Sequence, residues 1–585
     1  MSGEGGSSAA TPRYRLGARP LHEYLREHAR RQPDKTAYHW YGNAISYASL
    51  DRMSDAFATR LAALGVTRGN RVALFLNNCP QYVIAHFAIQ KLGAVVAPCS
   101  PLFKEAELEY QLRDLGAEVI VAADTLHPIL AAVRANTAIR HVFVTNYGDL
   151  LPTASHRVLP SASSSASSSA SPSSLPNEEP ITVPPELRVE RLVPAGAIDL
   201  MTVLAAPSTD RAVSTPTSAP AFPPSYLAPS PPLSLDDLAL LTYTSGTTGL
   251  PKGAMLTYGN ALFKSAVTAD GHDVRGDDIM LAIAPLYHIA GMLVGIGTAI
   301  YAGATTVLLH RFDPLATLQA IDHHHVSWWY SIAPMNVAAM KVPDADRFDL
   351  RSLRINPATS FGITLTEPLA RKWAAFTGGA KLHELAYGLS ETHTCDTFMP
   401  AGAVRWGTHG QLAPGVHCRI VDPDTKVALP IGQTGEILMK SAGNFKGYWN
   451  RPEATAATLR DGWVHTGDMG RLDADGYLSF LGRFKEMIKV SGYSVFPEEV
   501  ETLLIRHPAI AAAAVIGVPD ETKGEVVKAA VVLDAAYAGA RAPTPDDIIA
   551  WCRDNMSAYK VPRLVQIMLA LPATGAGKVL RRLLK

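Results

Sequence analysis

Leu241-Thr-Tyr-Thr-Ser-Gly-Thr-Thr-Gly-Leu-Pro-Lys-Gly253 joins a short apolar run to a segment rich in glycine, serine and threonine with a lysine near its end. Glycines permit backbone conformations in which successive N–H groups converge on an anion, and hydroxyl groups and the lysine add to that attraction. The segment therefore predicts a phosphate-binding loop after a buried strand. The residues expected to hold the phosphates are Thr244, Ser245, Gly246, Thr247, Thr248, Gly249 and Lys252.

This loop differs from a P-loop of the G-x-x-x-x-G-K-[ST] type, because Pro251 precedes the lysine and Gly253 follows it. A flexible polar turn is the alternative interpretation. The long run of hydroxyl-bearing residues and glycines between an apolar strand and a lysine favours phosphate binding over that alternative.

Short apolar runs on both sides of this loop alternate with a helical pattern. Tyr82–Leu92 is a predicted helix, ended by Gly93. Strands are predicted at Arg71–Asn77, Ala94–Pro98, Val119–Ala122, Leu238–Tyr243, Asp278–Ala284 and Thr305–Leu309. Strands that alternate with helices indicate an α/β fold, with mostly parallel sheets and helices on both faces.

The pattern changes towards the C-terminus. Between Gly407 and Lys440, shorter strands separated by glycines, such as His417–Val421 and Gly435–Met439, predict a more antiparallel, β-rich subdomain. A charge-rich stretch near Gly482–Lys489 then marks a junction. The remainder predicts a small α+β domain, with strands and helices at Phe496–Arg506, Ala511–Val518, Val526–Leu533 and Asp546–Asn555.

One segment has a different composition. Residues 151–232 are dominated by serine, alanine and proline, and Ser161–Ser174 is almost pure serine and alanine. Such a composition buries too little apolar surface to offset chain entropy, so we interpret it as a disordered insertion with short ordered patches around Ile181–Val193. The expected domains are a flexible N-terminus (1–19), a large domain (20–484, with the insertion at 151–232) and a small domain (485–585).

Composition excludes several classes of protein. The chain has 585 residues, of which 47% are hydrophobic and 18% charged, as in a soluble enzyme of more than one domain. Lys+Arg and Asp+Glu both number 53, so no net charge draws the protein towards nucleic acid or an anionic membrane. The longest apolar stretches, such as Ile279–Leu286 and Ala511–Val518, are too short to span a bilayer.

The cysteines indicate a reducing compartment, since none of the five forms a C-x-x-C pair, and they argue against a zinc site. The run His323-His-His325 is also expected to be a helix-end or loop cluster, because neighbouring side chains diverge. Cytoplasm is the expected location. Arg15-Leu16 followed by His22 partly matches an N-terminal peroxisomal signal, but Glu23 stands where that signal has an apolar residue.

Six segments together resemble the adenylate-forming superfamily, which includes acyl-CoA synthetases, 4-coumarate–CoA ligases, firefly luciferase and the adenylation domains of peptide synthetases. They occur in the order of that family and cover the chain from about residue 20 to residue 585 outside the insertion. In addition to the loop at 241–253, they are Pro285-Leu-Tyr-His-Ile-Ala-Gly291, Tyr387-Gly-Leu-Ser-Glu-Thr392, Gly462-Trp-Val-His-Thr-Gly-Asp468, Gly482-Arg-Phe-Lys-Glu-Met-Ile-Lys489 (continued by Ser491–Val500) and Thr574-Gly-Ala-Gly-Lys-Val-Leu-Arg581.

The resemblance implies an ATP-dependent acyl-CoA synthetase that forms acyl-AMP and then acyl-CoA, with Mg²⁺ as cofactor and coenzyme A as co-substrate. Glu391 and Thr244 are the implied Mg²⁺ ligands, and Lys578, Glu391 and Thr244 the implied catalytic residues. Tyr387 is expected to stack on adenine and Asp468 to accept both ribose hydroxyls. The implied nucleotide site also includes Gly388, Ser390, Arg483, Lys489 and Lys578.

The small domain is implied to be mobile and to use two faces in turn. Lys485 is the implied hinge residue. Ser491, Gly492 and Tyr493 are the implied lining of the channel for coenzyme A, where glycine lets a thin ligand pass closely. Lys578 is implied to enter the site only for adenylation.

The implied acyl pocket contains His288, Gly291, Met292, Ser360, Phe361 and Gly362. The sequence departs from the family here, because Ala358-Thr-Ser-Phe-Gly-Ile-Thr-Leu-Thr366 replaces the usual Gly-Gly-Ala segment. Ile289–Gly295 and Trp328-Trp-Tyr330 indicate an apolar pocket and hence a fatty or aryl acid, although the aromatic residues fit a plain core equally well.

Three alternatives remain. A peptide-synthetase module would keep an Asp near position 288, where this chain has a histidine without permanent negative charge. A non-catalytic adenylate sensor or scaffold disagrees with the presence of Glu391, Asp468 and Lys578. A stand-alone adenylating enzyme that passes the acyl group to another acceptor, such as a carrier protein, stays open.

Overall fold

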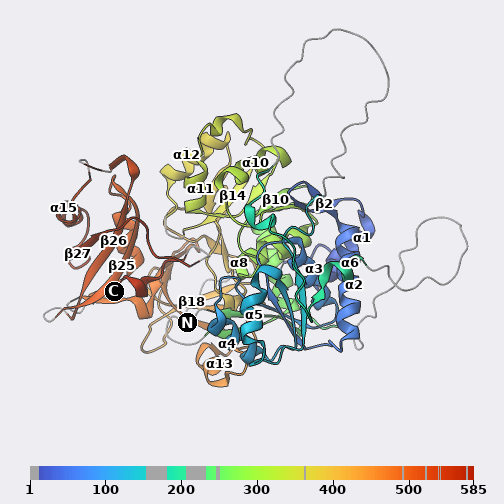
Figure 1. Ribbon diagram of the computed structural model, residues 1–585. Helices are drawn as coiled ribbons and strands as arrows, with labels where there is room; N and C mark the ends of the chain where they lie inside the picture. Colours follow the sequence, from blue (N-terminus) through green and yellow to red (C-terminus); the bar gives the residue numbers. More distant parts are fainter. Residues whose placement is uncertain are drawn as a thin grey trace, which may run out of the picture.

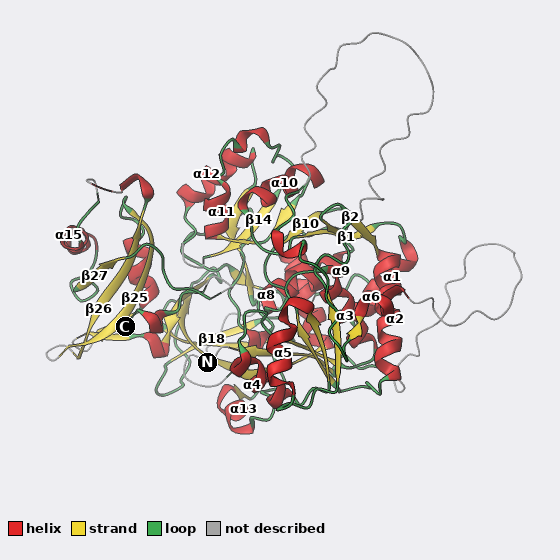
Figure 2. Ribbon diagram, in the orientation of Figure 1, coloured by secondary structure: helices red, strands yellow, loops and turns green. Residues whose placement is uncertain are grey.

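The computed structural model describes residues 12–152, 181–205, 232–244, 251–360, 364–490, 493–520, 524–537, 539, 542–574 and 578–584. The large domain contains two mixed sheets and a β-rich part, and the small domain stands beside it, coloured orange to red in Figure 1. Helices cover the sheets of the large domain (Figure 2). This arrangement confirms the predicted fold class.

The first sheet has the strand order β7-β6-β5-β3-β4-β8-β9. Its pairs are parallel except for the last, in which β8 and β9 form a hairpin around the phosphate-loop segment. Central strands β3, β4 and β5 are buried along nearly their whole length, as both covered faces require. The bounds are β3 Arg71–Phe75, β4 Val95–Pro98, β5 Val119–Ala123, β6 His141–Thr145, β7 Ile198–Asp199, β8 Leu238–Thr244 and β9 Lys252–Thr257.

The second sheet has the order β13-β14-β12-β10-β11-β1-β2, and β15 pairs with β14. All of its pairs are parallel except β1 with β2. The bounds are β1 Thr36–Trp40, β2 Asn43–Ser46, β10 Ile279–Ala282, β11 Thr305–Leu308, β12 Trp328–Trp329, β13 Ser331–Ile332, β14 Ile355–Thr359 and β15 Lys381–Glu384.

Helices fill the space around and between these sheets. The side chains of α4 and α5 pack on one face of the first sheet, and those of α2 and α3 on the other. Helix α3 is buried on all sides, and its Lys91 pairs with Asp51 and Asp55 at 2.5 and 2.8 Å. The bounds are α1 Leu21–Arg31, α2 Tyr47–Ala63, α3 Pro80–Lys91, α4 Glu105–Leu115, α5 His127–Arg134, α6 Leu200–Ala205, α7 Tyr258–Gly271, α8 Ile289–Met292, α9 Ala299–Ala302, α10 Pro314–His324, α11 Ala333–Ala339, α12 Glu367–Thr377 and α13 Pro452–Thr458.

The β-rich part has the order β18-β19-β21-β20, with β22 paired to β21 and all pairs antiparallel, as predicted. Helix α7 connects it to the rest, because Leu262 and Ala266 belong to the main core while Phe263 and Val267 pack against the β-rich part. The bounds are β16 Thr397–Phe398, β17 Gln411–Leu412, β18 His417–Val421, β19 Gly435–Lys440, β20 Leu459–Arg460, β21 Trp463–Leu472 and β22 Leu478–Arg483.

The small domain has its own hydrophobic core, formed by residues from Ile488 to Val561. Its sheet has the order β24-β23-β26-β25, and β27 pairs in parallel with β26. The bounds are β23 Ile488–Val490, β24 Tyr493–Val495, α14 Pro497–Leu504, β25 Ile510–Asp520, β26 Gly524–Leu533, α15 Pro545–Asn555 and β27 Leu564–Ile567. The domain boundaries at residues 19 and 484 stay predictions.

Within residues 151–232, short ordered patches were predicted around Ile181–Val193, and the structure extends that order to residue 205. Strand β7 extends the first sheet, pairing Ile198 with Phe143, and α6 follows it. Leu187 and Leu200 are buried. Strand β7 and helix α6 were not predicted, because serine, alanine and proline dominate the composition of the whole segment. Residues 153–180 and 206–231 lie outside the described residues.

This packing makes Leu200 a test of the correction. Leu200→Ala is expected to lower the stability of the large domain by roughly 2–5 kcal/mol, because the side chain is fully buried. Urea unfolding followed by tryptophan fluorescence measures the effect. Leu192→Ala is the matched control, since Leu192 is 61% exposed and should change stability by about 0.5 kcal/mol at most. Equal effects of the two substitutions would contradict the structural role of this segment.

No helix within the described ranges is both long and apolar enough to cross a membrane. The triple histidine lies at the end of α10, where His325 adopts a left-handed backbone conformation. The described residues contain no group of three histidine, cysteine, aspartate or glutamate side chains that could hold a metal ion.

Candidate functional site

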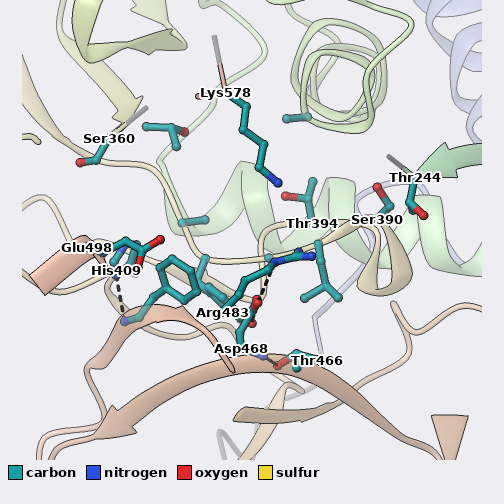
Figure 3. A pocket seen from close by; sticks show the side chains of 18 of the residues that line it. Thr244, Ser360, Ser390, Thr394, His409, Thr466, Asp468, Arg483, Glu498 and Lys578 are labelled. Carbon is teal, nitrogen blue, oxygen red and sulfur yellow. Dashed lines mark hydrogen bonds and ion pairs between the residues drawn. The ribbon is translucent and has the colours of Figure 1, made fainter. Parts of the chain in front are cut away.

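A cavity of about 1210 Å³ lies between the two domains. The carboxyl ends of several strands of the large domain line it on one side, and α14 and the Lys578 loop of the small domain line it on the other. Figure 3 shows polar side chains of both domains pointing into it. The cavity brings together many of the predicted residues: Thr244, Lys252, His288, Ser360, Tyr387, Gly388, Ser390, Glu391, Asp468, Arg483 and Lys578. Ser245–Gly249, Phe361, Gly362, Ser491 and Gly492 lie outside the described residues.

The phosphate-loop segment is flanked by the β8–β9 hairpin. Thr244 ends β8 and is paired with Lys252, which begins β9. The Lys252 ammonium lies 4.5 Å from the centre of the Tyr448 ring, a cation–π contact. The hairpin therefore places a hydroxyl and a positive charge side by side at the cavity.

Glu391 lies in a 3₁₀ turn, Ser390–Thr392, followed by residues with left-handed backbones: His393, Thr394 and Cys395 have φ of 57°, 56° and 48°. Such conformations cost about 1–3 kcal/mol each and persist only where the surroundings impose them.

A buried ion pair supplies part of that constraint. Lys264 donates to Asp396 at 2.6 Å and to the carbonyl of Cys395 at 3.2 Å, and neither charged side chain of the pair is exposed. Thr392 also donates its hydroxyl to Asp396. The loop that presents Ser390 and Glu391 to the cavity is thus held from behind.

Tyr448 was not identified from the sequence, yet it connects two of the predicted residues. Its hydroxyl donates to Glu391 Oε1 at 2.6 Å, and its ring makes the cation–π contact with Lys252. Burial raises the pKa of Tyr448, and the nearby Glu391 carboxylate raises it further, so the hydroxyl stays a donor. The only signal in the sequence was an aromatic residue in a Gly-Tyr-Trp run, which is usual in cores.

The nucleotide motifs converge on Asp468. Tyr387 donates its hydroxyl to Asp468 Oδ2 at 2.8 Å, and Arg483 Nε lies 3.1 Å from Oδ1. Asp468 and Arg483 are register partners across β21 and β22, which explains how residues fifteen positions apart meet. The Tyr387 ring also packs on Phe480, with centroids 5.8 Å apart.

Asp468 retains an open acceptor. Among the described residues, none donates a hydrogen bond of good geometry to its buried Oδ1, although Arg483 pairs with that atom electrostatically. Burial raises the pKa of Asp468, and the Arg483 charge opposes that rise. A buried carboxylate oxygen without a donor fits a ligand hydroxyl such as those of ribose.

Lys578 belongs to a short loop closed by two hydrogen bonds. The amide of Thr574 donates to the Lys578 carbonyl at 2.7 Å, and the Lys578 amide donates to the Thr574 hydroxyl at 3.1 Å. The side chain extends into the cavity towards Arg483 and Thr394 (Figure 3). Burial lowers the pKa of Lys578, and the Arg483 charge adds to that effect.

His288 faces the same part of the cavity. Its ring is open to the cavity, yet desolvation by the surrounding protein lowers its pKa to about 4 and the Lys578 charge contributes, so the imidazole is neutral near pH 7. Its Nδ1 accepts from the amide of Ala290 at 3.4 Å at the start of α8. The site therefore presents no negative charge at position 288.

Gly291 and Met292, also predicted for the acyl pocket, are not among the residues that line the cavity. A Cβ at position 291 would lie 2.1 Å from the carbonyl oxygen of Pro285, so the glycine is needed for close packing. Met292 is buried. Of the aromatic run, Trp328 and Trp329 are core residues, and only Tyr330 lines the cavity.

The wall beside Tyr330 carries polar groups, although apolar residues such as Ile289 and Leu385 also line the cavity. Ser360 donates its hydroxyl to Glu384 at 2.6 Å and its amide at 3.2 Å, and Tyr330 and Thr359 share a hydrogen bond of 3.1 Å. Burial raises the pKa of the Glu384 carboxyl to about 7, against the opposing effect of both Ser360 donors. Sequence reasoning missed Glu384, because a glutamate at a strand end is ordinarily solvated.

The raised pKa of Glu384 has a measurable consequence for stability. Between the unfolded value of 4.5 and the folded value of about 7, the folded protein holds a proton that the unfolded chain has lost. The contribution of Glu384 to the free energy of unfolding is therefore fully present below pH 4.5. It is lost as the pH rises through about 7, by ~3 kcal/mol in all. Glu384→Gln should remove this pH dependence. The stability of the variant minus that of the wild type should therefore be larger at pH 8 than at pH 5. Urea midpoints at both pH values measure the difference.

Glu367→Gln is the control for this prediction, because Glu367 is solvent-exposed and lies away from the cavity. Its difference from the wild type should be the same at both pH values. A Glu384→Gln difference that also stays constant would contradict a buried, proton-holding carboxyl.

The remaining predicted residues belong to the junction and the small domain. Lys485 lies in the 3₁₀ turn Phe484–Glu486, directly after β22. Lys489 is the central residue of β23, and Tyr493 begins β24 and pairs with Val490. Their roles stay predictions.

The oxygen atoms of Glu391 and Thr244 are of the type that binds a magnesium ion. Glu391 uses Oε1 for Tyr448, and among the described residues none donates to Oε2, which leaves one carboxylate oxygen for a cation. The Thr244 hydroxyl lines the same cavity. Hard oxygen ligands of this type are those that Mg²⁺ prefers.

Comparison with known proteins agrees with this geometry. The model for AMP-binding enzymes matches residues 25–449, and that for the AMP-binding enzyme C-terminal domain matches residues 499–578. A long-chain-fatty-acid–CoA ligase of Bacillus subtilis (strain 168) is 34% identical over 576 residues, which cover 97% of this chain and 94% of the relative. A feruloyl-CoA synthase of Amycolatopsis sp. is 33% identical over 560 residues, covering 94% and 96%.

Solved structures give the same result. An anthranilate CoA ligase in complex with anthranoyl-AMP superposes with a TM-score of 0.79 at 25% sequence identity, over 97% of this chain and 96% of that one. The first family model covers well over half of the chain, and the two relatives match along nearly their whole length. The chain therefore belongs to the family of AMP-binding enzymes.

Proposed function

We propose that this protein is an ATP-dependent acyl-CoA ligase, which converts a carboxylic acid and ATP to acyl-AMP and pyrophosphate and then transfers the acyl group to coenzyme A. The observation that carries the proposal is that Lys578 of the small domain reaches the same cavity as Asp468 and Glu391 of the large domain. Membership of the AMP-binding family supports it.

In the first half-reaction, a carboxylate oxygen attacks the α-phosphorus of ATP and the bond to the pyrophosphate oxygen breaks. Both reactants are negative, so catalysis requires positive charge around the phosphorus. Lys252 and Lys578 supply it from two sides, and Asp468 orients the nucleotide through the ribose hydroxyls. Mg²⁺, held by Glu391 and the Thr244 hydroxyl, would neutralise charge on the phosphates.

In the second half-reaction, the thiol of coenzyme A attacks the acyl carbon and AMP leaves. We assign Lys485 to the hinge and Ser491, Gly492 and Tyr493 to the thiol channel, with Lys489 near the AMP phosphate. The separate core of the small domain supports a change of its orientation between the two steps, since a rotation leaves that core intact.

The acid is proposed to be a fatty or aryl acid. The related long-chain-fatty-acid–CoA ligase and feruloyl-CoA synthase support these two classes. His288 is neutral, so it offers no counter-charge to the ammonium group of an amino acid. Burial of an unpaired ammonium costs several kcal/mol or more, and free amino acids are therefore expected to be poor substrates.

The test is to incubate the purified protein with MgATP and a panel of saturated fatty acids, aryl acids and amino acids, with and without coenzyme A. Pyrophosphate and acyl-CoA are measured separately. We expect acid-dependent pyrophosphate release, thioester only with coenzyme A, and the highest rates with a fatty or aryl acid.

Amino-acid-dependent pyrophosphate exchange above that of every fatty and aryl acid would overturn the substrate class. Pyrophosphate release without any thioester would instead favour another acceptor, such as a carrier protein. Absence of acid-dependent pyrophosphate release across the whole panel would contradict the acyl-adenylation reaction itself.

We also propose a cytoplasmic location. Its support is that all five cysteines are free and buried, which fits a compartment that keeps thiols reduced. Cell fractionation with an antibody to the protein would test it, and recovery in an organelle fraction would contradict it.

A further inference from the structure

The loop that carries Lys578 is followed at once by an arginine surrounded by carboxylates. Arg581 Nη1 donates to Glu486 at 2.8 Å, and Nη2 donates to Glu501 at 2.9 and 3.0 Å. Nη2 also pairs with Glu498 at 2.8 Å. The four side chains are only 14–23% exposed, so solvent screens these contacts weakly. We call this group the Arg581 cluster.

The cluster joins three parts of the small domain. Glu486 belongs to the turn Phe484–Glu486, directly after the proposed hinge residue Lys485. Glu498 and Glu501 lie one turn apart on α14, and Glu501 also accepts from the amide of Val515 in β25 at 2.7 Å. One guanidinium thus connects the catalytic loop, the hinge turn and the body of the domain.

The geometry of the loop makes this connection consequential. Ala573, just before the loop, pairs with Val579, just after it, as an isolated bridge. The Leu580 amide also donates to the carbonyl of Pro572 at 2.8 Å. These contacts close the loop on itself, and Val579 also packs against Ala514, Ile516 and Ala530 of the small-domain sheet. Arg581, three residues beyond Lys578, adds the connection to the hinge turn and to α14.

The cluster also touches the large domain. A Cβ at Gly482 of β22 would lie 2.0 Å from Glu498 Oε2, so the glycine lets α14 approach closely in this arrangement. That buried oxygen receives no hydrogen bond from the described residues, and burial raises the pKa of the Glu498 carboxyl to about 8. Three carboxyls around one guanidinium are thereby partly neutralised by a proton.

We propose that Arg581 is a positioning residue for Lys578: it fixes the loop of Lys578 to the hinge turn and to α14, so that the lysine enters and leaves the cavity with the small domain as one body. This inference rests on the proposed function, because Lys578 must act in adenylation. The Arg581 guanidinium is engaged by the three carboxylates of the cluster, so its proposed role is to hold Lys578 in place and not to contact the reactants. Its removal should displace the lysine without removing it.

The test uses Arg581→Met and Glu486→Ala in the full-length protein, each measured in both half-reactions. We expect the kcat of acyl-AMP formation to fall roughly 10- to 100-fold in Arg581→Met, with KM for ATP nearly unchanged, because misplaced catalytic groups cost rate more than ground-state binding. Conversion of supplied acyl-AMP and coenzyme A to thioester should stay within about threefold of the wild type, since that step does not use Lys578.

The matched control is Arg582→Met, because Arg582 is exposed and adjacent in the chain. It should leave both half-reactions unchanged. Arg581→Lys should recover part of the adenylation rate, since an ammonium keeps the charge but cannot bond all three carboxylates with the fork of a guanidinium. Glu486→Ala keeps the bonds to α14 and decides the question if Arg581→Met does not fold.

Lys578→Ala is run beside these variants. If it loses adenylation while Arg581→Met and Glu486→Ala keep the full rate, the positioning role is wrong and the proposed function stands. If both half-reactions and the melting temperature fall together in the folded variants, Arg581 is only a structural residue and the proposal is overturned. If the wild type forms no acyl-AMP, the proposed function fails instead.

Discussion

Lys578→Ala is expected to reduce acyl-AMP formation by roughly 10²–10³-fold, the usual cost of losing one preorganised charged donor at a transition state. The side chain extends into the cavity beside Arg483 in this arrangement (Figure 3). Conversion of supplied acyl-AMP and coenzyme A to thioester should be nearly unchanged, because the lysine acts where charge builds between carboxylate and α-phosphate. Pyrophosphate release and acyl-CoA formation, measured separately, give the two rates.

Lys372→Ala serves as the control, since Lys372 is exposed on α12 of the large domain and does not line the cavity. It should leave both rates unchanged. An equal loss of both half-reactions in folded Lys578→Ala would rule out alternation of the small domain in this protein. Loss of thioester formation alone would mean that the two faces of the domain are assigned in reverse.

Glu391→Gln is the second substitution with a large expected effect. It keeps the shape of the side chain and a partner for the Tyr448 hydroxyl, but it removes the negative charge that would hold Mg²⁺. We expect acid-dependent pyrophosphate release to fall by about 10²-fold at saturating ATP. A titration with MgCl₂ should show half-activation at a higher concentration than in the wild type.

Tyr448→Phe tests the contribution of the hydrogen bond to Glu391. It keeps the carboxylate and the aromatic ring beneath Lys252 but removes the hydroxyl that donates to Glu391. Its loss should be smaller, about tenfold, with the same direction of shift in the Mg²⁺ titration. Unchanged Mg²⁺ dependence in Glu391→Gln would exclude this glutamate as a metal ligand and leave its hydrogen bond to Tyr448 as its role.

The nucleotide site shows how far sequence motifs reach. Thr244, Glu391, Asp468 and Lys578 stand in segments separated by up to more than three hundred positions, and all line one cavity. The glycine-rich loop carries a strong local signal of its own. Glu391, Asp468 and Lys578 would each pass for an ordinary charged residue alone, and they were recognised because six segments occur in the order of the family. Their partners could not be recognised, because Tyr448 and Glu384 resemble ordinary core and surface residues until the chain folds.

The acyl pocket shows the opposite case. Apolar residues at 289–295 and the aromatic run at 328–330 predicted an apolar lining. Ile289, Ala290 and Tyr330 do line the cavity, whereas Trp328 and Trp329 pack inside the core and Gly291 packs against the Pro285 carbonyl. Which of these residues face the cavity depends on the direction in which each side chain leaves a very short strand. A two-residue strand such as β12 carries no periodicity from which that direction could be read.

The sequence by itself determined the α/β class, the separate small domain, the positions of several central strands and the family motifs, because hydrophobic period and glycine-rich loops are local properties of the chain. Only the tertiary structure decided which residues meet: the pairing of β7 with the first sheet, the polar contacts of Glu384 and Ser360, and the carboxylates around Arg581. These depend on contacts between residues far apart in the chain. Burial and charge at such contacts are products of the whole packing, and no short window of sequence contains them.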